Sequence, residues 1–381
     1  MSDQRVTLDI LAPSHSQLPV ASYFDPDLFA REKRVLFGAA PRYVGHGLAV
    51  PEVGDFQTLA AEGDGRVLLR TDSGLRLLSN VCRHRQAVML RGRGQTGSRI
   101  VCPLHRWTYD LAGELVGAPH FDDDPCRGLA SYPLQSWNGM AFETPSGAGA
   151  GAGRNIAAEL AGIGPAADLD FTGYVFDSVH QHECDYNWKT FIEVYLEDYH
   201  VAPAHPGLGG FVSCDDLRWE FGPHHSVQTV GPKNELAKPG SPAYRKWHDA
   251  VLAYREGRFA DPVPRHGAIW LTSYPATMVE WYPHVLVVST LHPRGPQKTL
   301  NVVEFYYPED IHAFERQFVE AEQAAYWETC GEDDEIALRM DAGRRALMER
   351  GDDDAGPYQS PMEDGMQQFH EWYAREMQRT R

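Results

Sequence analysis

The fold of the N-terminal part of this chain follows from two short stretches, Cys82-Arg-His84 and Cys102-Pro-Leu-His105. Each stretch offers one thiol and one imidazole, and each follows a run typical of a β-strand, Leu77–Val81 in the first case and Ile100–Val101 in the second. Two such loops can hold a metal centre between them, because each contributes two ligand side chains. The pattern therefore predicts a small β module built around a metal site.

The ligand types leave two interpretations of that site open. Thiolates favour zinc or an iron–sulfur cluster, whereas imidazoles bind zinc, copper and iron. A structural zinc ion is one interpretation, but a zinc finger usually pairs cysteine with cysteine and histidine with histidine along the chain. The other is a Rieske-type [2Fe–2S] cluster, with two cysteines on one iron and two histidines on the other. Because each loop here carries one of each, the order along the chain favours the cluster.

The residues around these four side chains resemble a known family. They read Cys82-Arg-His84-Arg85 and Cys102-Pro-Leu-His105-Arg-Trp107-Thr-Tyr109-Asp110, with Gly113 and Pro119 behind. Both stretches resemble the two cluster loops of Rieske proteins, although Arg106 stands where the family usually has glycine. The resemblance implies that the cluster is held by four ligands, Cys82, His84, Cys102 and His105.

A second pair of histidines, His200 and His205, lies about 95 residues further along the chain. Five residues along an unbroken helix would turn their side chains about 140° apart, which is wrong for a single metal. The segment from Asn187 is predicted to be helical, and Pro203 is expected to end this helix after His200 and to let His205 turn back. A mononuclear non-haem iron uses two imidazoles and one carboxylate on one face. The two histidines would supply the imidazoles.

The segment around these histidines resembles the mononuclear-iron segment of the Rieske non-haem iron oxygenases. The shared features are Asn187-Trp-Lys189, a glutamate at Glu193, and the ending Asp198-Tyr-His200-x₄-His205. The order of the two segments along the chain also matches the family. The resemblance implies that this chain carries both a Rieske cluster and a mononuclear iron(II).

The third iron ligand is implied to be a carboxylate from far along the chain. Residues 331–336, Gly-Glu-Asp-Asp-Glu-Ile, resemble the family's aspartate-bearing segment, in which the ligand lies three residues before the apolar position at Ile336. This spacing selects Asp333, with Asp334 as the runner-up. Acidic residues are also favourable at a helix N-terminus, so the same stretch is expected to open a helix.

The resemblance also implies how electrons reach the iron. In this family one subunit's cluster lies next to its neighbour's iron in a head-to-tail homotrimer, and a carboxylate bridges a cluster histidine and an iron histidine. On the predicted helix Glu197 shares the face of His200, while Asp198 points about 160° away. We therefore expect Glu197 to link His200 to His105 of a neighbouring subunit. Many members have aspartate here, and one subgroup with glutamate acts on quaternary ammonium compounds.

Changes in composition and in hydrophobic pattern along the sequence predict four parts. Residues 1–40 form an N-terminal helical segment that packs on the catalytic domain, and residues 41–145 form the Rieske domain. A Gly/Ala linker covers 146–158, and residues 159–381 form the mononuclear-iron catalytic domain. The expected fold class is α+β, with a small all-β domain and a larger domain of the helix-grip type, in which helices pack on an antiparallel sheet. Strand candidates in the larger domain lie at 268–271, 284–291 and 300–307.

The composition excludes several functional classes. The 35 basic and 53 acidic residues give a net charge of −18. Such a surface repels phosphate backbones and anionic lipid, which argues against nucleic-acid and membrane partners. The first residues carry no export signal, so a cytoplasmic location is expected. The spaced glycines Gly92, Gly94 and Gly97 lie among short β-type runs and do not open a predicted helix, so they do not form a dinucleotide-binding fingerprint. NAD(P)H and flavin are therefore expected to bind only to a separate reductase.

The resemblance implies the terminal oxygenase of a multicomponent system. Electrons would come from a reductase, with or without a ferredoxin, and dioxygen would be used for mono- or dihydroxylation or oxidative demethylation of a small organic substrate. We expect that substrate to be aromatic; the alternatives are a quaternary ammonium compound, or a Rieske electron carrier without oxygenase activity. Aromatic residues that could line an apolar pocket are Trp270, Trp281, Tyr282, Phe305 and Tyr307.

Overall fold

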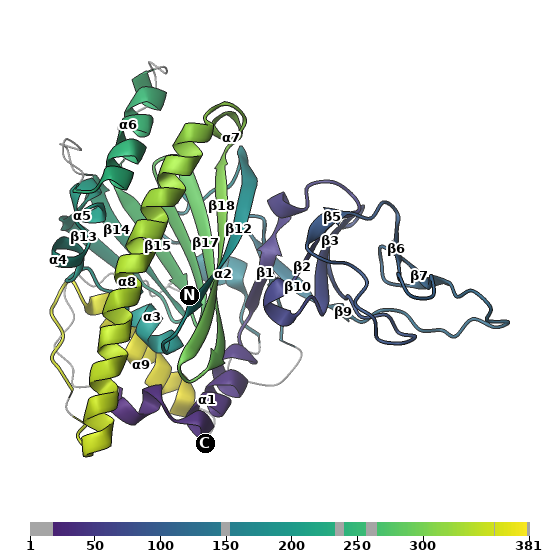
Figure 1. Ribbon diagram of the computed structural model, residues 1–381, viewed down its shortest axis with the longest axis horizontal. Helices are drawn as coiled ribbons and strands as arrows, with labels where there is room; N and C mark the ends of the chain where they lie inside the picture. Colours follow the sequence, from purple (N-terminus) through teal and green to yellow (C-terminus); the bar gives the residue numbers. More distant parts are fainter. Residues whose placement is uncertain (1–17, 146–152, 233–239, 257–264, 354, 379–381) are drawn as a thin grey trace. The chain divides into compact units, whose positions relative to one another are not determined.

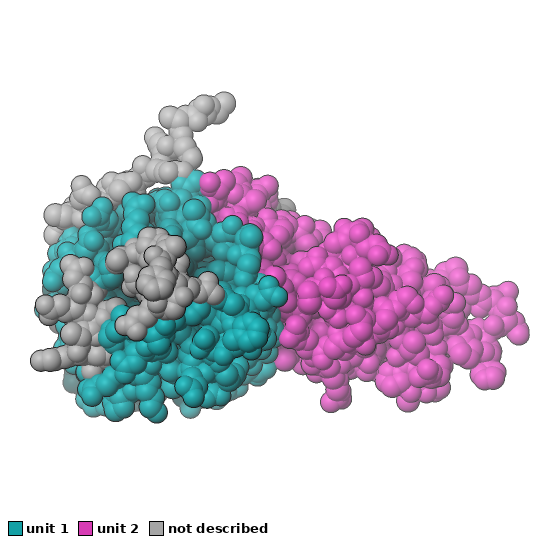
Figure 2. All heavy atoms as spheres, turned by 90° about the horizontal axis from the view of Figure 1, so that it is seen from above, with its two compact units in different colours: residues 1–38, 162–381 teal, residues 39–161 magenta. Residues whose placement is uncertain are grey.

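The computed structural model describes the chain from residue 18 to residue 378, apart from residues 146–152, 233–239, 257–264 and 354. The first half of the expected Gly/Ala linker therefore lies outside the described residues. The contacts within the chain divide it into two compact units, which Figure 2 shows in different colours. Unit 2 comprises residues 39–161, and unit 1 comprises residues up to 38 together with residues 162–381.

Unit 2 is built from short antiparallel strands in three sheets. The strand orders are β1-β11-β10, β5-β2-β3-β4-β9 and β6-β7-β8. The strands are β1 (Arg42–His46), β2 (Asp55–Thr58), β3 (Arg66–Thr71), β4 (Gly74–Ser79), β5 (Arg93–Gln95), β6 (Arg99–Val101), β7 (Thr108–Asp110), β8 (Leu115–Gly117), β9 (Ser131–Tyr132), β10 (Leu134–Trp137) and β11 (Met140–Glu143). The helical pieces of this unit are η3 (Gly47–Ala49), η4 (Ala60–Glu62) and α2 (Ile156–Leu160).

The apolar core of unit 2 lies directly under the two cysteine-bearing stretches. Val67 and Leu69 of β3 and Ile100 of β6 are completely buried. These side chains pack in one cluster with Cys82 and Cys102. Because a packed core fixes the positions of its side chains, the two sulfur atoms are held by the fold of this unit.

Unit 1 contains one seven-stranded antiparallel sheet in the order β12-β18-β17-β16-β15-β14-β13. The strands are β12 (Tyr174–Cys184), β13 (Val212–Phe221), β14 (His225–Pro232), β15 (Ala268–Ser273), β16 (Thr277–Tyr282), β17 (Val285–Gly295) and β18 (Lys298–Pro308). The three strand candidates of the sequence fall in β15, β17 and β18, and are confirmed. An antiparallel sheet packed by helices was the expected fold class, and this is the architecture observed.

The helices of unit 1 include one very long member. They are η1 (Val20–Tyr23), α1 (Pro26–Glu32), η2 (Lys33–Phe37), α3 (Trp188–Tyr195), α4 (Val201–Ala204), α5 (Leu208–Phe211), α6 (Pro242–Glu256), α7 (Glu309–Phe314), α8 (Arg316–Arg350) and α9 (Asp364–Gln378). None of the helices described here is long and apolar enough to cross a membrane.

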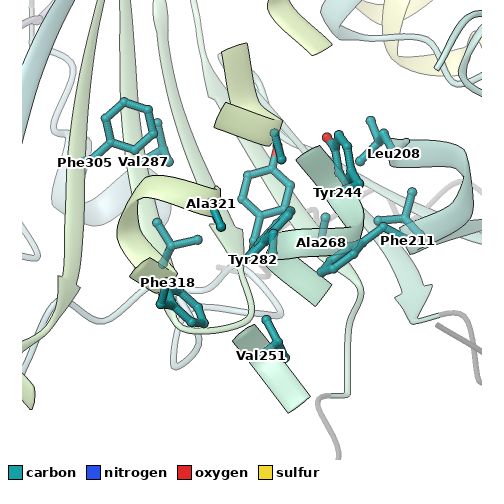
Figure 3. Close-up of a cluster of buried hydrophobic side chains, with 14 of the residues drawn as sticks. Leu208, Phe211, Tyr244, Val251, Ala268, Tyr282, Val287, Phe305, Phe318 and Ala321 are labelled. Atoms are coloured by element: carbon teal, nitrogen blue, oxygen red, sulfur yellow. The ribbon is translucent and has the colours of Figure 1, made fainter. Parts of the chain in front are cut away.

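Helix α8 crosses one face of the sheet (Figure 1), and α6 packs with α8 and with sheet residues in one apolar cluster. Tyr244 of α6 and Phe318 of α8 join sheet residues such as Tyr282 and Phe305 in a single buried cluster (Figure 3). The ring of Trp247 stacks on that of Phe211, with 4.3 Å between ring centroids. Large aromatic side chains dominate this cluster, and they bury much apolar area per residue.

Helix α8 corrects one sequence-based expectation. The acidic stretch 331–335 was expected to open a helix, but α8 runs without a break from Arg316 to Arg350. The acids therefore lie in its middle. The helix passes through Gly331, whose missing side chain costs only about 1 kcal/mol, and ends before Gly351, which adopts the left-handed conformation (φ 76°) that favours glycine.

Helix α3 is fixed by buried ion pairs to elements that lie far away in the sequence. The Lys189 ammonium lies 2.7 Å from the Glu32 carboxylate, and both side chains are completely buried. Glu32 also accepts a hydrogen bond from the indole of Trp188 at 2.8 Å. One turn later Glu193 pairs with Arg344 of α8 at 2.5 Å. Because a buried charge that loses its partner is strongly destabilising, these pairs hold α3 in one position.

Candidate functional site

The two cluster loops of unit 2 have the same backbone geometry. The Cys82 amide donates to the Ala87 carbonyl at 2.9 Å, and the Cys102 amide donates to the Trp107 carbonyl at 2.8 Å. In each loop the residue four positions after the cysteine has a positive φ, 60° at Gln86 and 62° at Arg106. This conformation favours glycine, which accounts physically for the glycine that Rieske proteins usually carry at the position of Arg106.

The four predicted cluster ligands come together at these loops. Cys82 and Cys102 are each 2% exposed, whereas His84 is half-buried and His105 exposed. The two imidazole rings lie 4.7 Å apart between centroids, and His84 stacks on Trp107. A Rieske cluster has one iron bound by two cysteines and the other bound by two histidines. The two buried sulfur atoms and the two more exposed imidazoles provide these two pairs of ligands.

Polar contacts at these loops also fit a bound cluster. Nδ1 of His84 is buried and lacks a hydrogen-bond partner among the described residues, as a nitrogen reserved for a metal would be. The Tyr109 hydroxyl accepts a hydrogen bond from the Arg83 amide at 3.1 Å and lies 3.5 Å from Sγ of Cys82. Its own hydrogen can therefore point at the sulfur. Hydrogen bonds to the sulfurs are one means of tuning the potential of such clusters.

The backbone leading to and between His200 and His205 differs from the prediction. Helix α3 ends at Tyr195 and does not reach His200. The amide of Asp198 donates instead to the carbonyl of Met362 at 3.0 Å, which draws the chain away from the helix. Pro203 does not terminate a helix either, because it lies inside the short α4, in a first turn where its missing N–H has no partner to lose.

Three side chains nevertheless converge in unit 1 as predicted from the sequence pattern. Nε2 of His200 lies 3.0 Å from Nε2 of His205. The Oδ1 atom of Asp333 lies 3.4 Å from the first nitrogen and 3.0 Å from the second. Three ligand atoms that face one another at these distances form the two-histidine, one-carboxylate set typical of non-haem iron(II). The donor set therefore fits the iron that the sequence resemblance implies.

Further carboxylates orient the two imidazoles. Nδ1 of His200 contacts Glu197 at 2.5 Å, and Nδ1 of His205 contacts Glu332 at 2.7 Å. In both rings Nε2 is left for the metal, an arrangement that is usual for metal-bound histidine. Burial opposes a charged imidazolium at His200, but Asp333 and Glu197 outweigh burial and raise its pKa to about 10. The site therefore favours a positive charge at its centre.

The two runner-up acids point elsewhere. Asp334 accepts a hydrogen bond from Tyr186 at 2.7 Å and contacts Nε2 of His182 at 2.7 Å, away from the iron ligands. Asp198 is buried against Gln228, and burial raises its pKa to about 7. The helical-face argument for preferring Glu197 was wrong, because this stretch is not helical. The contact of Glu197 with His200 depends instead on the turn after α3, in which the Glu197 carboxylate also accepts the His200 amide at 3.0 Å.

A cavity of about 90 Å³ opens beside these ligands. Two of the five aromatic residues proposed from the sequence line it, Trp270 and Tyr282, while Trp281, Phe305 and Tyr307 do not. Residues from α3 to α6, β15, β16 and α8 form its walls: Phe191, Val194, Tyr195, Glu197, Asp198, His200, Val201, His205, Leu208, Tyr244, Trp247, Trp270, Glu280, Tyr282, Glu322, Tyr326, Thr329, Cys330 and Asp333.

Sequence reasoning missed two functional candidates in this cavity, Glu280 and Glu322. Glu280 interrupts the otherwise apolar and aromatic strand β16, and it is 2% exposed. Glu322 is 1% exposed, but in the sequence it is one of many acidic residues of α8 and nothing distinguishes it from the others. The signal that could have found Glu280 is a single acid at the centre of a strand that reads as fully buried.

Two family models match the chain. The Rieske [2Fe-2S] domain matches residues 43–133, and the ring hydroxylating alpha subunit (catalytic domain) matches residues 171–379. The chain is a Rieske oxygenase alpha subunit. The family carries a Rieske [2Fe–2S] cluster and a mononuclear non-haem iron, and it takes its electrons from a separate reductase.

Curated relatives of this Rieske oxygenase extend over nearly its whole length. A putrescine 2-hydroxylase from Ralstonia nicotianae is 65% identical over 96% of this chain and 97% of its own length. A putrescine 2-hydroxylase from Bordetella bronchiseptica is 56% identical over 97% of this chain and 86% of its own length. A carnitine monooxygenase oxygenase subunit from Escherichia coli is 28% identical over 76% of this chain and 74% of its own length.

Solved structures share the fold. A quaternary ammonium Rieske monooxygenase in complex with an inhibitor superimposes with a TM-score of 0.73 at 20% identity, covering 97% of this chain and 96% of that chain. A naphthalene 1,2-dioxygenase with bound indole gives a TM-score of 0.71 at 17% identity, covering 96% and 93%. At these identities the likeness concerns the fold alone.

These comparisons decide between the hypotheses drawn from the sequence. The chain is an oxygenase, so the interpretations as an electron carrier and as a zinc-stabilised protein are excluded. The expectation of an aromatic substrate finds no support, because the two relatives at 65% and 56% identity are named for putrescine, an aliphatic diamine. Hydroxylation of a small substrate stands as the general reaction.

Substitution of Asp333, the predicted third iron ligand, gives a direct test of the site. Asp333→Asn removes the carboxylate that meets both imidazoles, so we expect the iron content to fall from roughly three to roughly two atoms per chain. Acid-labile sulfide and the red-brown colour of the cluster should stay unchanged. Asp334→Asn is the matched control and should keep roughly three irons. Loss of iron from the Asp334 variant alone would contradict the assignment.

Proposed function

We propose that this chain is the terminal oxygenase that hydroxylates putrescine, or a closely similar aliphatic diamine, at carbon 2. The observation that carries this proposal is the 65% and 56% identity to two putrescine 2-hydroxylases, which extends through both the Rieske and the catalytic regions. The cavity beside the iron ligands supports it, because buried carboxylates line that cavity and a diamine carries two positive charges at neutral pH.

The proposed reaction replaces one carbon-bound hydrogen by a hydroxyl group. It consumes one dioxygen, two electrons and two protons; one oxygen atom enters the substrate and the other leaves as water. The iron, when bound by His200, His205 and Asp333, supplies the activation of dioxygen. The protein holds the diamine in the cavity with one carbon toward that site, and keeps both nitrogens away from it.

The size of the cavity favours a slender substrate. Its volume of about 90 Å³ is smaller than the roughly 150 Å³ that holds one benzene ring in an engineered protein cavity. A four-carbon chain can enter such a space end-on, whereas a fused aromatic ring needs more width. The small volume therefore agrees with the aliphatic substrate for which the two putrescine 2-hydroxylases are named.

We also propose the homotrimer and the electron path that the family resemblance implies. Glu197 contacts His200 at 2.5 Å and so provides the half of the bridge that lies within one chain. His105 is exposed, as a ligand that meets a neighbouring subunit must be. Leu104 and Phe121, beside the cluster loops, are 56% and 48% exposed, and exposed apolar side chains of this size are typical of an interface.

A quaternary ammonium substrate is the second candidate. Glu197 is the residue shared with that subgroup, and a carboxylate-lined cavity with aromatic walls would also attract a trimethylammonium group. Because the chain is also 28% identical to a carnitine monooxygenase oxygenase subunit, quaternary ammonium compounds are included in the substrate test.

The substrate is tested by supplying the purified oxygenase with a surrogate reductase and NADH. Putrescine, carnitine and glycine betaine are compared by oxygen uptake and by mass spectrometry of the products. We expect uptake with putrescine and a product that is one oxygen atom heavier and keeps both amino groups. Demethylated products from the quaternary compounds, with no product from putrescine, would overturn the proposal.

The electron path is tested with Glu197→Gln, which keeps the size of the side chain but removes its charge. We expect both metal centres to stay filled while turnover falls about 100-fold. The decisive readout is the rate at which a pre-reduced cluster is reoxidised in the presence of substrate and dioxygen. Glu332→Gln, at the other histidine, is the matched control and should slow this step far less. Equal reoxidation rates in the Glu197 variant and the unmodified enzyme would remove Glu197 from the path.

A further inference from the structure

Two buried carboxylates in the substrate cavity lack a cationic partner. Glu280 on β16 and Glu322 on α8 both line this cavity. Within the described residues neither forms an ion pair with a lysine, arginine or histidine, and their side-chain partners are tyrosines. Such a group is unusual, since buried carboxylates are normally paired with a cation.

Two buried acids of the same unit, Glu32 and Glu193, follow the usual rule. Glu32 pairs with Lys189 at 2.7 Å, and Glu193 pairs with Arg344 at 2.5 Å. Both of these acids serve to join elements of the fold. The contrast suggests a different purpose for Glu280, because its negative charge is kept beside a cavity and is not neutralised by the protein itself.

The hydrogen bonds around Glu280 orient it and leave acceptor capacity. Oε1 accepts the Tyr326 hydroxyl at 3.1 Å, and Oε2 accepts the Tyr282 hydroxyl at 2.9 Å. Tyr282 in turn accepts the Trp270 indole N–H at 2.8 Å, which directs its own hydrogen toward Glu280. A carboxylate oxygen has about two acceptor sites, so each oxygen of Glu280 can accept a further donor.

The electrostatics of the two carboxyls agree with a missing positive charge. Burial raises the pKa of Glu280 to about 7, and the hydrogen bonds from Tyr282 and Tyr326 only partly oppose this. Burial, together with the nearby Glu280 charge, raises the pKa of Glu322 to about 8, against the opposing hydrogen bond from Tyr307. A cation that enters the cavity would favour the ionised form of both groups.

Aromatic rings complete a surrounding suited to an ammonium group. The ring of Tyr282 lies edge-on to Trp270 at 6.1 Å and to Trp247 at 5.9 Å between centroids. All three line the cavity. Ring faces attract cations, most strongly where water is excluded.

We infer that Glu280 is the residue that receives an ammonium group of the substrate, with Glu322 supplying a second negative charge and Trp270 and Tyr282 flanking the bound nitrogen. This inference rests on the proposed function and names the group that determines its specificity. Because one end of the diamine is held at Glu280, the number of methylene groups between that end and the reacting carbon decides which carbon reaches the iron ligands.

The same arrangement discriminates between classes of amine. A primary ammonium has three N–H donors, which can use the remaining acceptor sites of Glu280. A trimethylammonium group has none, so it would bury this carboxylate without filling those sites. Such unfilled polar groups are a strong source of discrimination in binding sites. The cavity is therefore expected to prefer primary diamines to quaternary compounds.

The first test measures binding directly by calorimetry with putrescine, using the iron-loaded, oxidised holoenzyme without dioxygen. Glu280→Gln keeps the size of the side chain and removes its charge, so we expect putrescine to bind about 100-fold more weakly. Cluster and iron content should stay unchanged. The matched control is Glu304→Gln, because Glu304 is a buried acid of the same sheet that also accepts a tyrosine hydroxyl, that of Tyr306 at 2.9 Å, but does not line the cavity. The Glu304→Gln variant should bind putrescine with the same affinity as the unmodified enzyme.

A second variant gives a readout that a purely structural role would not produce. Glu280→Asp retracts the carboxylate by one methylene, which lengthens the cavity by about the same amount. We compare kcat/KM for putrescine with kcat/KM for the five-carbon diamine. In this variant we expect the preference to shift toward the longer diamine, so that the ratio of the first value to the second falls by about 10-fold or more. This variant keeps the charge, so it also serves if Glu280→Gln does not fold.

The outcomes separate the two proposals. If the unmodified enzyme binds and hydroxylates putrescine but both Glu280 variants keep its affinity and chain-length preference, the inference on Glu280 fails and the proposed function stands. If the unmodified enzyme neither binds nor hydroxylates putrescine, both fail. Weaker binding to Glu280→Gln with full metal content, together with the shifted preference of Glu280→Asp, supports both.

Discussion

The active site depends on one constraint: the carboxylate of Asp333 must meet two imidazoles that lie more than 120 residues earlier in the chain. The long helix α8 carries Asp333 across the sheet, where the aromatic core holds the helix in place. The histidines follow α3, which is tied to α8 by the buried pair of Glu193 with Arg344. Because such pairs are costly to break, the ligands are positioned before any metal binds.

The sequence allowed the ligands to be predicted but not the backbone that carries them. His200 and His205 could be named as candidate ligands from their residue types and the family resemblance, and Asp333 from the resemblance of residues 331–336 to the family's aspartate-bearing segment. Helix ends are decided by distant contacts: the Asp198 amide bonds to the carbonyl of Met362, and this partner is invisible in the local sequence. The sequence shows Glu280 as a lone acid in an apolar strand, but one such acid forms no motif that assigns a role, since that role depends on the cavity that Glu280 faces.

The chemistry of the site joins two kinds of negative charge. The carboxylates at the predicted iron ligands favour a metal cation, and we infer that Glu280 and Glu322, which line the cavity, favour a cationic substrate. Unpaired buried carboxylates make the empty cavity unfavourable, so the diamine that we propose as substrate would remove a cost that the free protein bears. This links the binding of the correct substrate to its orientation, since a neutral or aromatic compound of equal size would leave the same carboxylates without a partner.

The most direct measurement is a crystal structure of the iron-loaded enzyme with putrescine, obtained without dioxygen. The account predicts an ammonium nitrogen within about 3 Å of the Glu280 carboxylate, and carbon 2 as the substrate atom nearest the metal held by His200, His205 and Asp333. An ammonium bound at Glu197 or Asp198, with Glu280 left without a ligand, would contradict it.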